Sequence, residues 1–417
     1  MKTLLMVLSY KYPYEPPTEQ FLHAELPYHK NNDTDILIVP YANGIDFSKE
    51  YEYDKTFSVV PMERSKSADA IWGGLGIMAN CFSLIKEAVK IIKKVAPKRI
   101  PNALVYTIKQ QAQISTFTHC LKKTFKNTDF SKYDKVILYS YWLNSIAPAL
   151  VSFKKYLEKS GAKKVISLSR VHGQGDLYID SFPDEYRPFA KALSKLDCIY
   201  CLSEHGVEHL AKRGIGNTAV ARLGIDRLFD STQQKNEIPT IVSCSVINEN
   251  KRVTEIAKAV SKLHQNVRWI HFGGGDGYDA LHIWCKDNMP ENINWELKGW
   301  SKNEDIQKMY SMTPPDVFIN LSKVEGVPVS IMEAMSYSIP CIATNAGATS
   351  AIVENGKNGI LLPVDFKTEE VSIALTDLLT LSDEEKAQFN KNAFDTWNNK
   401  YNANKNFTEF SKTINEL

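Results

Sequence analysis

Two glutamates, Glu325 and Glu333, flank a segment that could bind a phosphate group. The apolar run at residues 317–321 predicts a buried parallel strand, and residues 340–344 predict the next one. Pro328 suits the first position of the helix between them, because a missing N–H costs nothing there. The sequence therefore predicts a βαβ unit that presents the free N–H groups of a helix N-terminus just beyond a strand.

The two carboxylates would repel the phosphate itself, so they must have another role in such a site. Each can accept hydrogen bonds from hydroxyl groups, while backbone N–H groups between them hold the phosphate. A ribose and a hexose on either side of a diphosphate would supply those hydroxyls. The alternative is a pair of surface glutamates that favour a helix start through its dipole. Both interpretations stay open on these residues alone.

The full segment EGVPVSIMEAMSYSIPCIAT, residues 325–344, resembles the paired-glutamate motif of retaining GT-B glycosyltransferases (glycosyltransferase family 4-like, group 1). Seven residues separate Glu325 from Glu333, as in that motif, and Gly347 and the NGKNGILL segment also match. The resemblance is strong over residues 220–363 and looser before them. It implies an α/β protein with the GT-B fold, in which two Rossmann-like domains face a central cleft.

The length of 417 residues already favours two domains. Residues 1–229 are predicted to form an N-terminal Rossmann-like domain that binds the acceptor. Residues 235–397 are predicted to form a second one that binds the nucleotide-sugar. The polar run 230–237 has the composition of a linker between them. The resemblance further implies that residues 398–417 form a helix that packs back on the first domain.

The resemblance assigns three catalytic residues. Glu325 would hold hydroxyl groups of the sugar, and Lys251 falls where related enzymes place a lysine on the diphosphate. His172 follows the expected strand at residues 164–169, and its segment RVHGQGDLY resembles the place where related enzymes keep a histidine near the donor sugar. The carboxyl end of a parallel strand is also where such sheets bind ligands. The alternative for His172 is a loop histidine with a structural partner.

Eight residues are predicted to bind the donor, and Glu333 among them would hold the ribose hydroxyls. The eight are Glu333, Gly326, Val327, Val329, Arg252, Gly274, Trp300 and Ser301. An arginine typical of the family is missing at or near Ser245, and the nearby Arg252 either replaces it or points elsewhere. Trp300 either stacks on the base or belongs to the core. No metal motif of the DxD type is evident, so neither a metal nor a cofactor is expected, the nucleotide-sugar being a co-substrate.

The function implied is retaining, metal-independent transfer of a hexose-type sugar from a nucleoside diphosphate sugar to a glycan or lipid-linked acceptor. Cell-envelope or exopolysaccharide synthesis is the expected setting. Two alternatives stay open: a non-catalytic GT-B partner subunit and a same-fold nucleotide-sugar epimerase. The missing arginine motivates the first, as does a loop at residues 9–17 that lacks glycine. That loop, followed by a predicted helix cap at Thr18, also has no GxGxxG fingerprint, which counts against an oxidoreductase.

The composition adds further limits. With 43% hydrophobic and 24% charged residues the chain is ordinary for a globular protein, and a net charge of +2 gives no reason to expect nucleic acid. Cys198 and Cys201 have CxxC spacing without a second pair, so buried thiols in a reducing cytoplasm are expected rather than zinc. The apolar N-terminus is too short for a signal peptide and predicts a first core strand. No apolar run reaches membrane-spanning length.

The segment from Lys86 to Lys126 is predicted to be helical and strongly basic. Its lysines and arginine face a single acidic residue, Glu87, and apolar residues interleave with them at helical spacing. Two interpretations stay open: a core helix with a solvated lysine face, or a surface that rests on anionic lipid. The second would place a cytoplasmic protein at the inner face of the membrane.

Overall fold

The structure is a computed structural model that describes residues 2–15, 19–50, 52–173, 176–177, 179, 182, 186–231 and 236–417. The chain divides into two compact units, unit 1 (Met1–Arg222 with Phe407–Leu417) and unit 2 (Leu223–Asn406). These divisions fall at 222/223 and 406/407, whereas the sequence placed them at residues 229 and 398. The predicted cap at Thr18, and parts of the predicted linker and of the RVHGQGDLY segment, lie outside the described residues.

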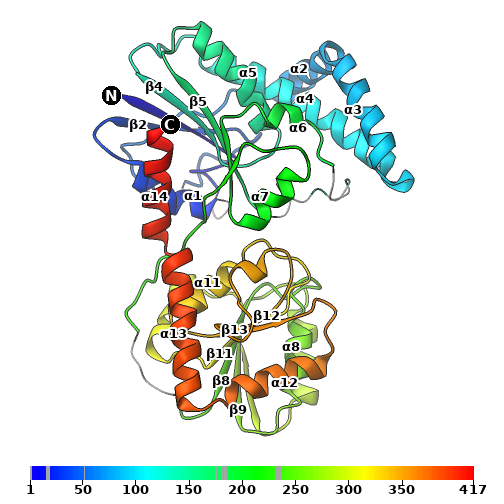
Figure 1. Cartoon of the computed structure of the whole chain (residues 1–417), viewed down its shortest axis with the longest axis vertical. Coiled ribbons are helices and arrows are strands. Elements are labelled where there is room, and N and C mark those ends of the chain that lie inside the picture. Colours follow the sequence, from blue (N-terminus) through cyan, green and yellow to red (C-terminus); the bar gives the residue numbers. More distant parts are fainter. Residues whose placement is uncertain are drawn as a thin grey trace. The chain divides into compact units, whose positions relative to one another are not determined.

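Unit 1 contains a parallel sheet with strand order β3-β2-β1-β4-β5-β6-β7 (Figure 1). Its strands are β1 (Thr3–Ser9), β2 (Thr34–Pro40), β3 (Ser58–Val59), β4 (Lys135–Ser140), β5 (Val165–Val171), β6 (Cys198–Cys201) and β7 (Thr218–Val220). Side chains alternate between the faces of a strand. In β1, Leu4 and Met6 belong to one core while Leu5 and Val7 belong to another. Both faces of this sheet are therefore covered.

The helices of unit 1 supply the two covers. They are α1 (Gln20–Glu25), η1 (Leu26–His29), α2 (Lys66–Ala79), α3 (Cys81–Lys94), η2 (Pro97–Arg99), α4 (Ile100–Thr124), α5 (Ile146–Lys159), α6 (Ala190–Leu193), α7 (Glu204–Ala211) and α14 (Ala403–Glu416). Phe410 of α14 lies in the core beside α1. Beneath its ring the buried Arg170 forms an ion pair with Glu25. The prediction that the segment from Lys86 to Lys126 is helical is confirmed by α3 and α4 over most of its length.

Unit 2 contains a second parallel sheet, with strand order β10-β9-β8-β11-β12-β13. Its strands are β8 (Thr240–Cys244), β9 (Val267–Phe272), β10 (Ile293–Leu297), β11 (Val317–Asn320), β12 (Cys341–Thr344) and β13 (Gly359–Leu362). Its helices are α8 (Val253–Val260), α9 (Tyr278–Asn288), α10 (Asn303–Met312), α11 (Val329–Ser336), η3 (Thr349–Ala351), α12 (Thr368–Leu379) and α13 (Asp383–Lys400). The predicted βαβ unit is confirmed as β11, α11 and β12.

Both sheets reverse their strand order at one point, beside β1 in unit 1 and beside β8 in unit 2. The loops that follow the carboxyl ends of the flanking strands diverge there, and this is where open α/β sheets bind ligands. Within the described parts of the chain, no helix combines the length and apolarity that crossing a membrane requires.

Candidate active site

The N-terminus of α11 offers free backbone donors at the carboxyl edge of the unit 2 sheet. The helix begins after Pro328, which has no N–H of its own. Among the described residues, no acceptor lies opposite the N–H groups of Gly326, Val327, Val329 and Ser330. Unpaired N–H groups at the positive end of a helix favour an anion. Three predicted donor-binding residues therefore lie where a phosphate would be held.

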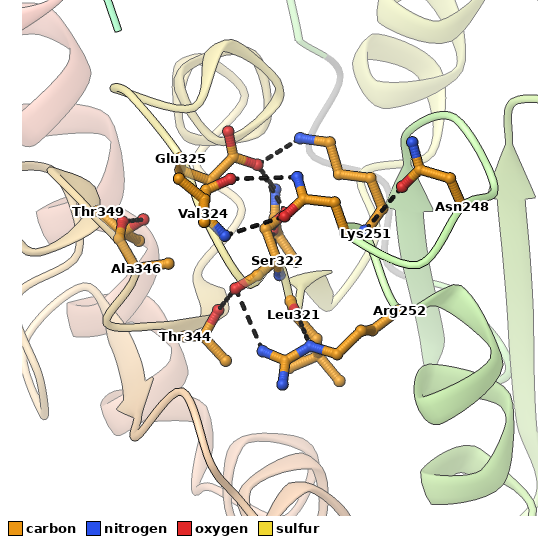
Figure 2. Close-up of polar contacts among 12 residues, drawn as sticks. Asn248, Lys251, Arg252, Leu321, Ser322, Val324, Glu325, Thr344, Ala346 and Thr349 are labelled. Atoms are coloured by element: carbon orange, nitrogen blue, oxygen red, sulfur yellow. Dashed lines mark hydrogen bonds and ion pairs between the residues drawn. The ribbon is translucent and has the colours of Figure 1, made fainter. Parts of the chain in front are cut away.

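Glu325 and Lys251, both predicted to be catalytic residues, are in direct contact. Figure 2 shows the Lys251 ammonium directed at the Glu325 carboxylate, and the two form an ion pair through Oε1. Ser322 donates its hydroxyl to the same oxygen at 2.6 Å. The Glu325 side chain is 12% exposed. Its other oxygen, Oε2, has no donor among the described residues, so it is available to a ligand hydroxyl.

The loop after β8 is bonded to the loop after β11. The Asn250 side chain accepts from the Val324 N–H at 3.0 Å and donates to the Val324 carbonyl at 3.2 Å. Arg252, whose φ of 51° places it in the left-handed region, directs its guanidinium at the carbonyls of Leu321 and Ser322, at 2.5 and 3.2 Å (Figure 2). A third bond reaches the Val364 carbonyl at 2.6 Å.

These contacts give Arg252 a positioning role. Its guanidinium donates to three backbone carbonyls and lies 4.4 Å from the centre of the Phe366 ring. Burial lowers its pKa. The interpretation in which this side chain points elsewhere is therefore the one that the geometry favours. Contact between Arg252 and a bound donor, in place of the missing family arginine, stays a prediction.

Gly347 permits the backbone of Glu325 to lie where it does. The glycine has a φ of 57°, and a Cβ atom built on it would overlap the Glu325 carbonyl oxygen. Any other residue would push the Glu325 loop away from the loop that follows β12. The close approach of these two loops thus explains why a glycine stands at position 347.

Glu333 lies one turn inside α11 and is partly buried. Its Oε1 accepts a hydrogen bond from the Asn303 amide of α10 at 2.6 Å. Burial raises the pKa of Glu333 to about 7, an effect that the hydrogen bond from Asn303 partly offsets. Its Oε2 has no donor among the described residues. Each glutamate of the pair is thus anchored through one oxygen and leaves the other for a ligand.

Trp300 lies on the surface rather than in the core. Its side chain is 76% exposed, so the interpretation as a core residue is wrong. The indole lies against Gly274, where a Cβ atom would come within 2.6 Å of Nε1. Gly273 donates its N–H to the Gly299 carbonyl at 2.8 Å, which joins the turns after β9 and β10. Ser301 Oγ bonds the same carbonyl at 3.3 Å. Stacking of Trp300 on a base stays a prediction.

His172 belongs to unit 1, at the carboxyl end of β5. Its Nε2 lies 3.0 Å from the Tyr141 carbonyl, which can only accept, so Nε2 carries the proton and Nδ1 is left with a lone pair. Burial, with a smaller contribution from Arg170, lowers the pKa of His172 to about 3. The ring is therefore neutral. Since His172 and Glu325 belong to different units, their action on one sugar stays a prediction.

Glu19 is a buried group that the sequence analysis did not identify. Its carboxylate accepts three consecutive backbone N–H groups after β1, those of Tyr10, Lys11 and Tyr12, at 2.7 to 2.9 Å. Trp142 donates its indole N–H at 2.7 Å from the loop after β4. Successive N–H groups that converge in this way form an anion-binding nest. In this chain the nest is occupied by the protein's own carboxylate, so the loop needs no glycine. Nothing in the local pattern distinguishes this glutamate from others.

No group of three or more His, Cys, Asp or Glu side chains is placed to hold a metal ion in the described ranges.

Residues 225–396 match the family model for glycosyl transferases group 1. This part of the chain is therefore similar to the glycosyl transferases of group 1. The match begins near the start of unit 2 and includes every predicted site residue except His172.

Curated relatives support the same assignment. The chain is 26% identical over 164 residues to N-acetyl-alpha-D-glucosaminyl L-malate synthase of Bacillus anthracis, covering 37% of this chain and 41% of that protein. It is 25% identical over 224 residues to UDP-Gal:alpha-D-GlcNAc-diphosphoundecaprenol alpha-1,3-galactosyltransferase of Escherichia coli, covering 51% of each. The chain therefore spans about half or less of the length of these two relatives.

Solved structures share the whole fold. Sucrose-phosphate synthase from Thermosynechococcus elongatus superposes with a TM-score of 0.66 at 12% identity, covering 100% of this chain and 99% of that one. Anabaena HepE in complex with UDP superposes with a TM-score of 0.62 at 13% identity and full coverage of both chains. These likenesses confirm the predicted fold class, two Rossmann-like α/β domains of the GT-B type. That the domains face a cleft stays a prediction.

The Glu19 nest predicts a large loss of stability in Glu19→Gln. The amide nitrogen would face N–H donors that a carboxylate oxygen now satisfies, which leaves at least one buried donor without a partner. We expect the free energy of unfolding to fall by about 2–4 kcal/mol, measured by urea denaturation. Glu158→Gln, at an exposed position of the same unit, is the control and should change it by less than about 0.5 kcal/mol. Equal effects of the two substitutions would contradict the nest.

The raised pKa of Glu333 predicts that Glu333→Gln stabilises the free protein at high pH. A carboxyl group whose pKa rises on folding contributes most below its ordinary pKa of 4.5, and this contribution is lost as the pH rises through about 7. Glutamine stays neutral, so the variant should match the wild type near pH 4.5 and exceed it by about 2 kcal/mol at pH 8. Denaturation at both pH values, with the exposed Glu291→Gln as control, measures this. A difference that does not change with pH would refute the burial effect.

Proposed function

We propose that this chain transfers a hexose-type sugar from a nucleoside diphosphate sugar to a glycan or lipid-linked acceptor, with the anomeric configuration retained and without a metal. The observation that carries the proposal is the Lys251–Glu325 ion pair beside the unpaired N–H groups at the start of α11. Relatives named for transfer to a diphosphoundecaprenol sugar and for colanic acid biosynthesis support a cell-envelope or exopolysaccharide setting. Solved complexes with UDP support a nucleoside diphosphate donor.

The chemistry to be promoted is a separation of charge. Breaking the anomeric bond leaves a positively charged, oxocarbenium-like sugar and a diphosphate that gains negative charge. Donors fixed in place before the reaction stabilise such a leaving group without reorganisation. The N–H groups of Gly326, Val327 and Val329 provide dipoles, and the Lys251 ammonium provides a full charge.

The ion pair suggests how donor binding rearranges the site. In the free protein the Lys251 ammonium lies on Glu325, which takes the place that the diphosphate would have. An arriving diphosphate competes for this cation. Glu325 then gives up one charged partner and keeps the hydrogen bond from Ser322. Its carboxylate becomes a stronger acceptor for the hydroxyl groups of the sugar.

The ionised carboxylate of Glu333 would accept hydrogen bonds from the ribose hydroxyls. Two hydroxyl donors favour the carboxylate over the acid, so donor binding would lower the pKa of Glu333 below its value of about 7. His172, neutral and with a free lone pair on Nδ1, would lie near the donor sugar. Trp300 and Ser301 would contact the base, and Gly274 would allow close approach of the nucleotide.

The remaining expectations are proposals of the same kind. Backbone dipoles and Lys251 would neutralise the diphosphate, so we expect neither a metal nor a cofactor to take part. The net charge of +2 gives no reason to propose nucleic acid as a partner. Nucleotide-sugars are supplied in the cytoplasm, which is where we place the reaction. Attachment to the inner face of the membrane would involve α2 to α4 and not these residues.

The proposal predicts distinct kinetic losses in three variants. Lys251→Ala should lower turnover by roughly 10²-fold or more, the scale of one lost transition-state donor. Glu325→Gln should weaken the sugar contact, and Glu333→Gln should mainly weaken donor affinity, seen as a higher KM. Lys323→Ala is the matched control, because this exposed lysine of the same loop has no side-chain partner among the described residues.

Transfer would be measured with the hexose donor that gives the largest thermal stabilisation in a panel of nucleoside diphosphate sugars. The anomeric configuration of the product would be determined by NMR, and reactions would be repeated with a chelator. Loss of activity with the chelator would contradict the metal-free mechanism. A wild type that binds its donor but neither transfers nor hydrolyses it would favour the non-catalytic partner subunit, and a product that is an isomer of the donor would favour an epimerase.

A further inference from the structure

Helices α2, α3 and α4 of unit 1 expose an unusual concentration of large apolar side chains. Among the described residues, ten of the 21 exposed large hydrophobic side chains lie in residues 71–108, less than a tenth of the chain. Figure 1 shows the three helices side by side at one edge of the unit, and α4 contacts both of the others. Single exposed hydrophobic residues are ordinary, whereas a concentrated patch indicates an interaction surface.

On α3 the exposed apolar residues follow helical spacing. Phe82, Ile85, Val89 and Ile92 are separated by three, four and three positions, so they share one face, and Phe82 is 79% exposed. We define the apolar face by these four residues together with five exposed apolar residues of α2 and α4 other than Trp72. The additions are Ile71, Leu75, Met78, Val105 and Ile108.

The apolar face continues across the helices. An apolar groove of about 280 Å³ lies between α3 and α4 and reaches the end of α2. Ile85 and Ala88 line it from α3, Leu104 and Ile108 from α4, and Ile77 from α2. The groove therefore joins exposed Ile85 of α3 to exposed Ile108 of α4 in one surface.

The same region is strongly basic. Residues 70–128 contain ten lysines and arginines against one acidic residue, a net charge of +9 (10 − 1). Lys86, Lys90 and Lys93 each follow an apolar position by one residue, so they form a stripe about 100° further round the helix. Glu87 is turned inward, where it is buried and accepts hydrogen bonds from the Tyr186 hydroxyl and, at 2.8 Å, from the Lys90 ammonium. Lys86 and Lys93 are left as the cations of the stripe that do not contact Glu87. Apart from Cys81 and Ser83, the exposed side chains of α3 are apolar or cationic.

We propose that the apolar face inserts into the surface of a membrane containing anionic phospholipid, with the flanking lysines among the headgroups. A helix with one apolar and one cationic stripe is suited to lie in the plane of such a surface. A second copy of this chain is the less suitable occupant, because it would bring another net +9 segment against the first. The inference depends on no step of the proposed transfer reaction.

Vesicle sedimentation tests the apolar part of this proposal. The wild type should bind phosphatidylcholine vesicles that contain phosphatidylglycerol. Met78→Ser/Phe82→Ser/Ile92→Ser should bind them at least about tenfold more weakly, because binding scales with inserted apolar area. Ile283→Ser/Ile373→Ser is the matched control, since both residues are 60% exposed in unit 2, and it should bind like the wild type. Circular dichroism would establish that all variants are folded.

A second pair of variants tests the cationic part. Lys86→Gln/Lys93→Gln should weaken binding roughly 30-fold at low salt, at about 1 kcal/mol for each lysine near an anionic surface. Lys155→Gln/Lys159→Gln, two exposed lysines on α5 of the same unit, should have little effect. High salt should weaken the wild type and leave a residual affinity that the apolar variant lacks.

Insertion depth has a natural reporter, because Cys81 at the start of α3 is the one exposed cysteine of seven. An environment-sensitive fluorophore on Cys81 should gain emission with anionic vesicles and be quenched by lipids labelled in the acyl chain. Equal binding to vesicles with and without phosphatidylglycerol would overturn the proposal. So would an apolar variant that binds like its control, or a free dimer in sedimentation equilibrium that this variant converts to monomer.

Discussion

The close approach of two loops, where Gly347 meets the backbone carbonyl of Glu325, is the constraint on which the candidate site depends. Arg252 fixes the same loop from its other side through backbone carbonyls, and Asn250 bonds it at Val324. Between these restraints the chain from β11 to α11 has little freedom. The Glu325 carboxylate and the N–H groups at the start of α11 are thus held in place before any ligand arrives, which is the condition for electrostatic stabilisation of a leaving group.

The free protein satisfies its binding groups with its own side chains. In unit 2 the Lys251 ammonium is neutralised by Glu325, and in unit 1 the nest after β1 is occupied by Glu19. The two cases differ in how tightly the internal group is held. Lys251 contacts Glu325 at the end of a flexible side chain that is 23% exposed, and we propose that an arriving diphosphate replaces Glu325 as its partner. Glu19 is buried and accepts four hydrogen bonds, so it acts as a permanent part of the loop.

The sequence pattern predicted the strands and the helix start, because these depend mainly on residues that are neighbours in the chain. Apolar runs identified β11 and β12 to within one residue, and Pro328 marked the start of α11. Parallel strands bring their carboxyl ends to one edge, so the resemblance could predict that Glu325 and Lys251 belong to one site. What the pattern did not show were contacts between distant parts of the chain. Arg252 had two open interpretations because its partners lie about 70 to 112 positions away.

The sequence pattern also did not show which side chains are exposed to solvent. A tryptophan next to a strand is compatible with a core position, whereas the structure shows the indole of Trp300 exposed at the surface beside Gly274. The basic segment carried two interpretations for the same reason. Its spacing predicted helices, but it could not show that most of α3 lies outside the core and that Glu87 is turned inward.

We propose that the N–H groups at the start of α11 hold the diphosphate of the donor. Amide chemical shifts of Gly326, Val327 and Val329, recorded by NMR during titration with a nucleoside diphosphate, test it most directly. We expect these three amides to move downfield together with saturation, as hydrogen bonding to an anion requires, and to stay in place with the nucleoside alone. Saturable binding of the diphosphate that leaves all three amides unmoved would contradict the account.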